Sequence, residues 1–315
     1  CIQAAGGLDL MVKWAEKLLR KNPQRITILS PLVTYLFTFI AGTGRVAYSV
    51  LPVIAEVATE TKIRPERPMA IAVIASQQAI TASPISAATV ALLSMLSGYN
   101  ISLMNILMIS VPCTLLGVLV GAIYSLKVGK ELDQDPEYLK RVANHEFSTE
   151  HYEAKGVENQ MKAALSVSIF VLATIAIVIF GSMESLRPVF TVGTEKVSMQ
   201  MSHIIEVLML TASAFILLFT KTDGIKAAQG SVFSAGMQAV VAIFGIAWMG
   251  DTFIAGNMTE LKGSIEHIVT QMPWLFGLAL FVMSILLFSQ AATIRALLPL
   301  GIALGISPYM LIALF

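Results

Sequence analysis

The chain has 315 residues, of which 56% are hydrophobic and only 13% charged, and its mean hydropathy is +0.76. Soluble domains carry about 25% charged residues, so this composition indicates an integral membrane protein with several spans in a lipid bilayer. The net charge of +1 is uninformative about nucleic acid, and no basic tract suggests such a partner. Cys1 and Cys113 are too few for a disulfide framework or a cysteine metal site. We therefore expect neither a metal nor a cofactor.

Both ends of the chain have the character of a segment cut from a longer protein. The opening CIQAAGG resembles the tail of a helix already under way, and SPYMLIALF begins a new apolar segment that stops at Phe315. We therefore expect a fragment that lacks both termini of its parent protein.

Two apolar stretches are divided at their centre by small and polar residues. The first, residues 26–58, follows the amphipathic segment 8–21 and is divided by AGTGR. The second, residues 273–304, follows the amphipathic segment 258–272 and is divided by SQAAT. Two apolar arms around such a centre predict a re-entrant hairpin, which enters the membrane and returns to the same side.

The remaining apolar runs are long enough to cross a bilayer, which requires about 20 residues. We predict these spans at residues 68–96, 101–126, 163–181, 201–220 and 230–250. Lysine and arginine residues stand on both sides of the first hairpin, which places both of its flanks in the cytoplasm. Counting spans onward puts residues 127–162 inside, and the second hairpin then enters from the opposite face.

The two hairpins also align with each other, Pro52 with Pro299 and Pro65 with Pro308. Two similar units in opposite orientation are typical of an inverted-repeat secondary transporter, although chance recurrence of leucine–proline pairs is the competing explanation. The expected architecture is an all-α integral membrane protein with two re-entrant hairpins and interrupted helices. Its parts are a partial first repeat (1–126, with an interrupted helix at about 68–97), a cytoplasmic connector (127–162) and a partial second repeat (163–315).

The segment SQQAITASPISAAT, residues 76–89, interrupts the apolar run 68–96 with hydroxyl groups, two glutamines and Pro84. A plain proline kink, in which nearby hydroxyls cover the freed carbonyls, is one interpretation. The other is a binding site, because a helix that restarts inside the membrane presents free N–H groups and a positive dipole end to an anion. Two pseudo-symmetric breaks would suit a ligand with two negative ends, while a phosphate or a single carboxylate remains an alternative.

Charged residues at these breaks are further candidates. Arg45 follows the first hairpin tip and Arg295 follows the second, and a bidentate carboxylate contact is one role for each. The alternatives are a structural pair with a carboxylate such as Glu56, or extension to the membrane surface. Glu56 and Asp251 are candidates for proton coupling, and for Asp251 we favour the outer surface.

The motifs IAGTGRVAYSVLPVIAEVA, RPERPMAIAV, QQAITASPISAATV, GIAWMGDTF and SQAAT occur in this order along the chain. In these motifs the sequence resembles the anaerobic C4-dicarboxylate transporters, the Dcu family of bacterial inner-membrane proteins, over essentially its whole length. The resemblance implies exchange of fumarate, malate or aspartate for succinate, or proton-coupled uptake, by an elevator motion within the ion-transporter superfamily. The aspartate- and fumarate-handling branch is the more similar one, and a homodimer is expected.

The resemblance also implies that hairpin tips and interrupted helices hold the substrate, with a second interrupted helix beyond Phe315. The substrate-binding residues carried over or proposed from the breaks are Thr43, Gly44, Arg45, Thr81, Ser83, Ser86, Ser289, Gln290, Thr293 and Arg295. In this hypothesis the hydroxyls of the first break and tip bind one carboxylate, and Gln290 with Thr293 approaches the other.

Three other functions compete with this one. A sodium-coupled carboxylate symporter of the same superfamily would use the same polar loops, and the sequence does not separate sodium from proton coupling. A channel is less consistent with closed, small-residue tips. An intramembrane enzyme lacks its signatures, since Arg45 stands where a Gly-x-Gly-Asp protease needs aspartate, and no Gly-x-Ser-Gly or His-Glu-x-x-His motif occurs.

Overall fold

The computed structural model describes residues 1–143, 157, 159–192, 195–234, 274–287 and 289–315, and separate positions between 236 and 272. The elements are α1 (Gly7–Lys21), η1 (Pro23–Arg25), α2 (Ile26–Ala41), α3 (Arg45–Glu60), α4 (Glu66–Ala82), α5 (Ala87–Met95), η2 (Ser97–Tyr99), α6 (Leu103–Ser125), η3 (Leu132–Gln134), α7 (Pro136–Ala143), α8 (Gln160–Ser182), η4 (Glu184–Leu186), β1 (Val189–Val192), β2 (Glu195–Ser198), α9 (Met201–Thr220), α10 (Gly224–Ala228), α12 (Trp274–Leu287), α13 (Gln290–Ala303) and α14 (Pro308–Leu314).

Five of these helical segments are long and apolar enough to cross a membrane. They agree with four of the five predicted spans and add the first arm of the first predicted hairpin; the remaining prediction, 230–250, falls partly outside the described residues. The helices carry exposed apolar side chains, as expected of surfaces that face lipid, among them Leu116, Val120, Leu172, Leu210 and Leu218. The candidate spans are Pro23–Ala41, Glu66–Met95, Leu103–Ser125, Gln160–Ser182 and Met201–Thr220.

The chain forms two compact units. The first comprises Cys1–Ser83, Pro112–Val171 and Ser213–Gly224, and the second comprises Pro84–Val111, Leu172–Ala212 and Ile225–Phe315. The boundary between Ser83 and Pro84 lies inside the interrupted segment described above. This division neither follows nor tests the predicted repeat boundaries, which stay a prediction.

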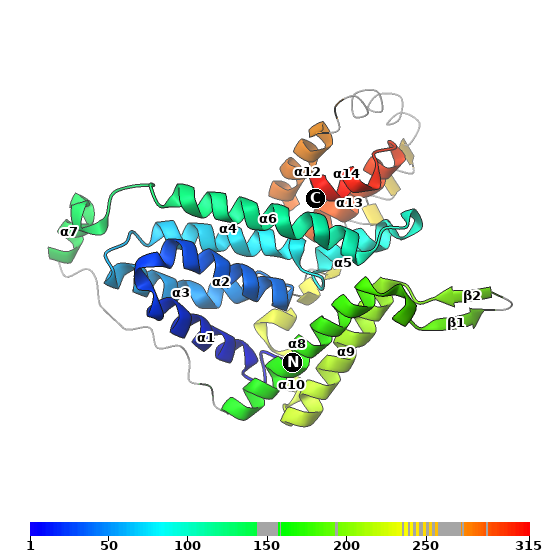
Figure 1. Ribbon diagram of the computed structural model, residues 1–315, viewed down its shortest axis with the longest axis horizontal. Coiled ribbons are helices and arrows are strands. Elements are labelled where there is room, and N and C mark those ends of the chain that lie inside the picture. The colour runs from blue at the N-terminus through cyan, green and yellow to red at the C-terminus, as the bar shows by residue number, and fades with distance from the viewer. Residues whose placement is uncertain are drawn as a thin grey trace. The chain divides into compact units, whose positions relative to one another are not determined.

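The centre of the first unit is a layer of helices in which α2 packs against both α3 and α4 (Figure 1). The predicted amphipathic segment 8–21 forms α1, and its apolar face packs against α3 and α2. Leu10, Ala15 and Leu19 are buried there, whereas Trp14 and Leu18 are exposed. Protein therefore covers the apolar stripe of this amphipathic segment.

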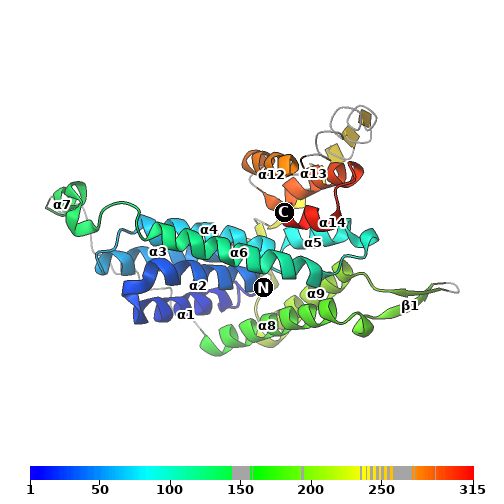
Figure 2. The ribbon, with the colours of Figure 1, turned by 45° about the horizontal axis from the view of Figure 1, so that its top comes forward.

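In the second unit α12, α13 and α14 pack against one another, and α5 packs against α13 (Figure 2). In each predicted hairpin two helices follow one another along the chain, α2 and α3 in the first and α12 and α13 in the second, and their re-entry into the membrane stays a prediction. At the first tip Gly42 has φ of +68°, a left-handed conformation that suits glycine and ends α2. The amphipathic segment predicted to precede the second hairpin, residues 258–272, lies almost entirely outside the described residues.

The aligned prolines occupy comparable places in the two hairpins. Pro52 lies inside α3 and Pro299 inside α13, the second arm in each case. Pro65 immediately precedes α4, and Pro308 is the first residue of α14. Both hairpins thus have the same order of elements: a first arm, a second arm that contains the aligned proline, and a further proline at the start of the next helix.

Two features were not predicted. The loop after α8 contains an antiparallel pair in which β1 Val189 lies opposite β2 Ser198, and the β-branched and aromatic residues of VFTV were the available signal. The second feature is that the start of the connector binds the α3–α4 turn. There the Leu132 amide donates to the Lys62 carbonyl, and Arg67 pairs with Glu131.

Candidate functional site

The predicted interruption of the apolar segment at Pro84 is present. Helix α4 ends at Ala82, Ser83 and Ser86 have extended backbone angles, and α5 begins at Ala87. Pro84 has no N–H group with which to continue the ladder. The result is a helix C-terminus and a new helix N-terminus within one candidate span, so backbone polar groups are available at the depth where a membrane supplies no water.

The hydroxyl groups of the break make local hydrogen bonds. Ser83 is fully buried and its Oγ donates to the Phe39 carbonyl at 2.7 Å, which satisfies one of the last carbonyls of α2. Thr81 donates to the Gln78 carbonyl at 2.7 Å. Ser86 caps α5, accepting from the Thr89 amide at 3.1 Å and donating to the Thr89 hydroxyl. The kink interpretation therefore accounts for these donors in this conformation, and a ligand role would require them to rearrange.

The tip of the first hairpin, Gly42 to Gly44, lies against the last turns of α4. A Cβ atom added to Gly44 would stand 3.0 Å from the Gln77 amide nitrogen and 3.3 Å from Ile80 Cδ1. Gln77 therefore borders the tip, although we did not name it among the site residues; its place in the polar run was the signal that could have identified it. The side chain of Arg45 lies outside the described residues.

The second tip belongs to the second unit. Ser289 caps α13, accepting from the Ala292 amide at 3.2 Å, and the Thr293 hydroxyl donates to the Ser289 carbonyl at 2.9 Å. Two residues after Thr293, the Nε atom of Arg295 is buried and has no hydrogen-bond partner among the described residues. A buried guanidinium donor favours an acceptor, so Arg295 is the predicted residue with the clearest capacity to bind an anion.

The ten predicted site residues divide between the two units. The first tip, Thr81 and Ser83 lie in the first unit, whereas Ser86 and the whole second tip lie in the second. Within the second unit, α13 packs against α5, so the second tip and the restarted half-helix form one packed group. The role of these residues in binding a substrate stays a prediction.

The carboxylate candidates have different surroundings. Glu56, with its side chain 12% exposed, pairs with Arg20 of α1 at 2.8 Å, and Arg20 also contacts Glu16 and Glu60. This network gives Glu56 a structural partner other than the Arg45 that we had considered. Asp251 lies outside the described residues.

Comparison with known proteins places the chain in one family. The family described as "Anaerobic c4-dicarboxylate membrane transporter" matches residues 1–315. The chain is 41% identical to C4-dicarboxylate transporter DcuA of Escherichia coli K12, covering 100% of this chain and 72% of that protein. It is 40% identical to DcuA of Wolinella succinogenes, covering 100% and 71%, and 38% identical to anaerobic C4-dicarboxylate transporter DcuB of Escherichia coli O6:H1, covering 99% and 71%. No solved structure matches the chain.

These matches confirm the resemblance found in the motifs, and with it the predicted class: a multi-pass transporter of the bacterial inner membrane and not an enzyme. The match runs through both hairpins and the interrupted helix. The chain belongs to the family of anaerobic C4-dicarboxylate membrane transporters.

Proposed function

We propose that this chain is the larger part of a secondary transporter that exchanges C4-dicarboxylates, such as fumarate, malate or aspartate for succinate, or takes them up with protons. The names of its relatives support the substrate class. Transport proceeds by alternating access, with the protein embedded in lipid and acting as a homodimer.

One observation carries the proposal: a candidate span stops at Ser83 and restarts at Ser86, and the restarted helix α5 packs on α13. The first amides of α5 have no partners within their own helix, and together with the dipole they favour an anion. Arg295 on α13 adds a buried Nε donor. A carboxylate matches both features, and the names of the relatives favour it over phosphate.

The lengths of the two arms of the second hairpin support the re-entrant interpretation of that hairpin. Helices α12 and α13 have 14 residues each, which corresponds to about 21 Å at 1.5 Å per residue. The hydrocarbon core is about 30 Å thick, so neither arm crosses it alone. Prolines at matching positions, Pro52 in α3 and Pro299 in α13, support a repeated unit in the two halves of the chain.

The decisive experiment is uptake of labelled fumarate into proteoliposomes that contain the full-length protein. The vesicles are preloaded with succinate or left empty, at several pH values, with sodium present or absent. We expect uptake that needs internal succinate or an inward proton gradient and that ignores sodium. A strict sodium requirement would move the protein to the symporter alternative, and no uptake under any condition would overturn the proposal.

Residue assignments are tested in the same assay. We expect Arg295→Gln and Gln290→Ala each to raise the KM for fumarate about tenfold or more, because one charge-assisted hydrogen bond contributes about 1.5–3 kcal/mol and 1.4 kcal/mol corresponds to a factor of ten. The matched control is Arg141→Gln, which removes an exposed arginine paired with Glu137 on α7. Unchanged KM values in both test variants would disprove the assignment of the second tip.

A further inference from the structure

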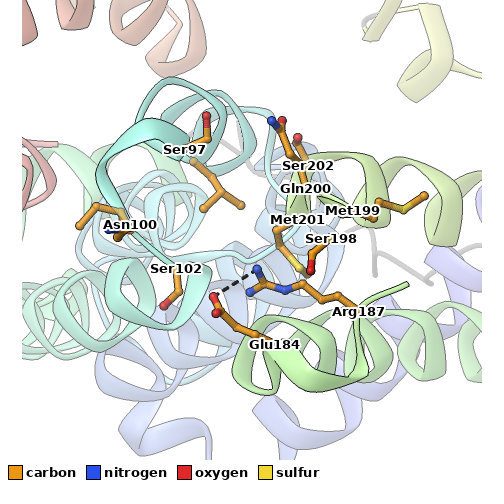
Figure 3. Close-up of a pocket in the computed structure, with 12 residues that line it drawn as sticks. Ser97, Asn100, Ser102, Glu184, Arg187, Ser198, Met199, Gln200, Met201 and Ser202 are labelled. Atoms are coloured by element: carbon orange, nitrogen blue, oxygen red, sulfur yellow. Dashed lines mark ion pairs between the residues drawn. The ribbon is translucent and has the colours of Figure 1, made fainter. Parts of the chain in front are cut away.

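A polar cavity in the second unit is lined by none of the ten predicted substrate-binding residues. It has a volume of about 370 Å³ and is formed by the end of α5 and the loop after it, the η4 turn after α8, and the end of β2 with the start of α9 (Figure 3). Helix α8 begins at Gln160, next to the connector, and ends at Ser182, next to the cavity. The cavity is therefore at the end of α8 opposite to the connector, the end predicted to face outward.

Arg187 supplies the positive charge of this cavity. Its side chain is only 13% exposed, and its guanidinium points toward the carboxylate of Glu184 (Figure 3). Nε donates to the Phe180 carbonyl at 3.1 Å and Nη1 lies 3.2 Å from Glu184 Oε1. Nη2 is buried and has no hydrogen-bond partner within the part of the chain that the structure describes. A buried guanidinium N–H without an acceptor is unfavourable, so the site favours an additional anionic oxygen.

Glu184 balances that charge only weakly. Its side chain is 70% exposed, and an ion pair in such a setting contributes little because water screens it. The other residues that line the cavity are uncharged, and hydroxyl and amide groups prevail among the polar ones, including Asn100, Ser198, Gln200 and Ser202. The volume falls in the range of small-molecule sites, about 300–1,000 Å³.

We propose that this cavity is an accessory binding site for small carboxylate anions, in which Arg187 Nη2 donates to a carboxylate oxygen and Asn100 or Gln200 contacts the remainder. This proposal rests on the proposed function, because the ligand of the cavity is the transported dicarboxylate. The dicarboxylate binds at the outer end of α8 before it reaches the hairpin tips. An arginine in a partly buried site suits a carboxylate because its N–H groups match the two oxygens.

The test uses the full-length protein with its native cysteines replaced and Ser198→Cys as a reporter at the cavity. The rate of modification by an uncharged, membrane-impermeant maleimide is measured with fumarate, or with sodium sulfate at equal ionic strength. We expect saturating fumarate to slow modification at least threefold and sulfate to leave it unchanged. Equal protection by sulfate would overturn a carboxylate site in favour of a general anion site.

Variants then assign the protection to Arg187. Arg187→Gln should abolish protection by fumarate, and Glu184→Gln, which removes the competing carboxylate, should lower the half-protecting concentration a few-fold. Arg141→Gln, an arginine with a similar ion pair on α7, is the matched control. Protection that persists in Arg187→Gln would refute the proposal, and an unshifted concentration in Glu184→Gln would do so even if the arginine variant failed to fold.

A transport assay distinguishes failure of the accessory site from failure of the proposed transport function. We expect Arg187→Gln to keep the maximal rate of fumarate uptake and to raise the KM from the outside a few-fold. Uptake by the wild type, without protection of the reporter cysteine in the Ser198→Cys variant, would refute the accessory site alone. Protection without any uptake would leave the site standing and refute the transport proposal.

Discussion

The two helical hairpins follow one plan but differ in what surrounds them. In the first, α2 and α3 pack with α4, and α1 covers part of their surface. In the second, α12 and α13 pack with α14 in the same order along the chain, and α5 is the helix against α13. The same order of helices therefore occurs in two different local environments.

The difference is clearest two residues after the aligned prolines. Ile54 follows Pro52 and is fully buried in the core of the first unit. Gly301 follows Pro299, and the rings and methyl groups of its neighbours approach its backbone closely. In the first hairpin the Ile54 side chain fills the space at this position. In the second hairpin the same space beside Gly301 is filled by Phe276 of α12 and Leu311 of α14.

Substitution at these two positions should have the largest effect on stability. We expect Ile54→Ala to lower the free energy of unfolding by about 2–5 kcal/mol, because it leaves a cavity. Gly301→Ala should lower it by about 1–3 kcal/mol through overpacking, because the new Cβ would stand 2.7 Å from Phe276 Cζ and 2.8 Å from Leu311 Cδ2. Thermal unfolding in detergent measures both, and a stabilised Gly301→Ala protein would contradict the comparison.

The ionic network on the first hairpin gives the next largest effect. We expect Glu56→Gln to lower the free energy of unfolding by about 1–2 kcal/mol, because Arg20 keeps only a neutral amide oxygen in place of its charged partner at 2.8 Å. Fumarate uptake and its pH dependence should stay unchanged, because the contact is structural. Glu60→Gln, which removes a longer and more exposed contact to the same arginine at 3.4 Å, is the control with a smaller effect. Loss of proton coupling in Glu56→Gln would instead restore Glu56 as a proton relay.

Hydroxyl groups at the helix break and at the second tip offer a third comparison. We expect Ser83→Ala to cost about 1 kcal/mol of stability because the Phe39 carbonyl loses its donor. Ser289→Ala should cost a similar amount by removing the N-cap of α13. Ser182→Ala, which removes an exposed hydroxyl bonded to Val178, should change stability by less than about 0.5 kcal/mol. Equal effects of all three in urea or thermal unfolding would show that the break and the second tip have no special role.

Much of the architecture could be read from hydropathy and spacing because a bilayer imposes a minimum length on each span and small residues mark the turns between arms. The tip at Gly42 and the break at Pro84 were predicted for this reason, and the structure contains both. Long-range pairing was not accessible in the same way. The contact of Arg20 with Glu56 joins residues 36 positions apart, and no local pattern specifies it.

The site was predicted less completely than the fold. Residue type identified Arg295 as a candidate, but only packing shows that its Nε is buried without a partner among the described residues. Conversely, Ser83 is of a residue type that often binds ligands, yet its hydroxyl donates to the Phe39 carbonyl of another helix. Arg187 carried no sequence signal, because the cavity around it arises from three segments brought together by folding.

The smallest effect concerns the connector where it binds the α3–α4 turn. Burial raises the pKa of the Asp135 carboxyl, but hydrogen bonds from the Glu137 and Tyr138 amides and from Arg64 outweigh it and hold the pKa below its ordinary value. A carboxyl with a depressed pKa in the folded protein contributes stability above its unfolded-state pKa and loses it as pH falls through the folded value. At neutral pH Asp135 is therefore ionised, and its ion pair with Arg64 at 2.8 Å contributes fully to stability.

We accordingly expect hydrogen-exchange protection at the Leu132 amide, bonded to the Lys62 carbonyl, to fall slightly between pH 5 and pH 3 after correction for intrinsic rates. In Asp135→Asn, which cannot ionise, protection should be lower at neutral pH and should not change across this range. Glu137→Gln is the control, because its side chain pairs with Arg141 and not with the turn. A pH response that survives in Asp135→Asn would assign the attachment to Glu131 and Arg67, the neighbouring pair on the same segment.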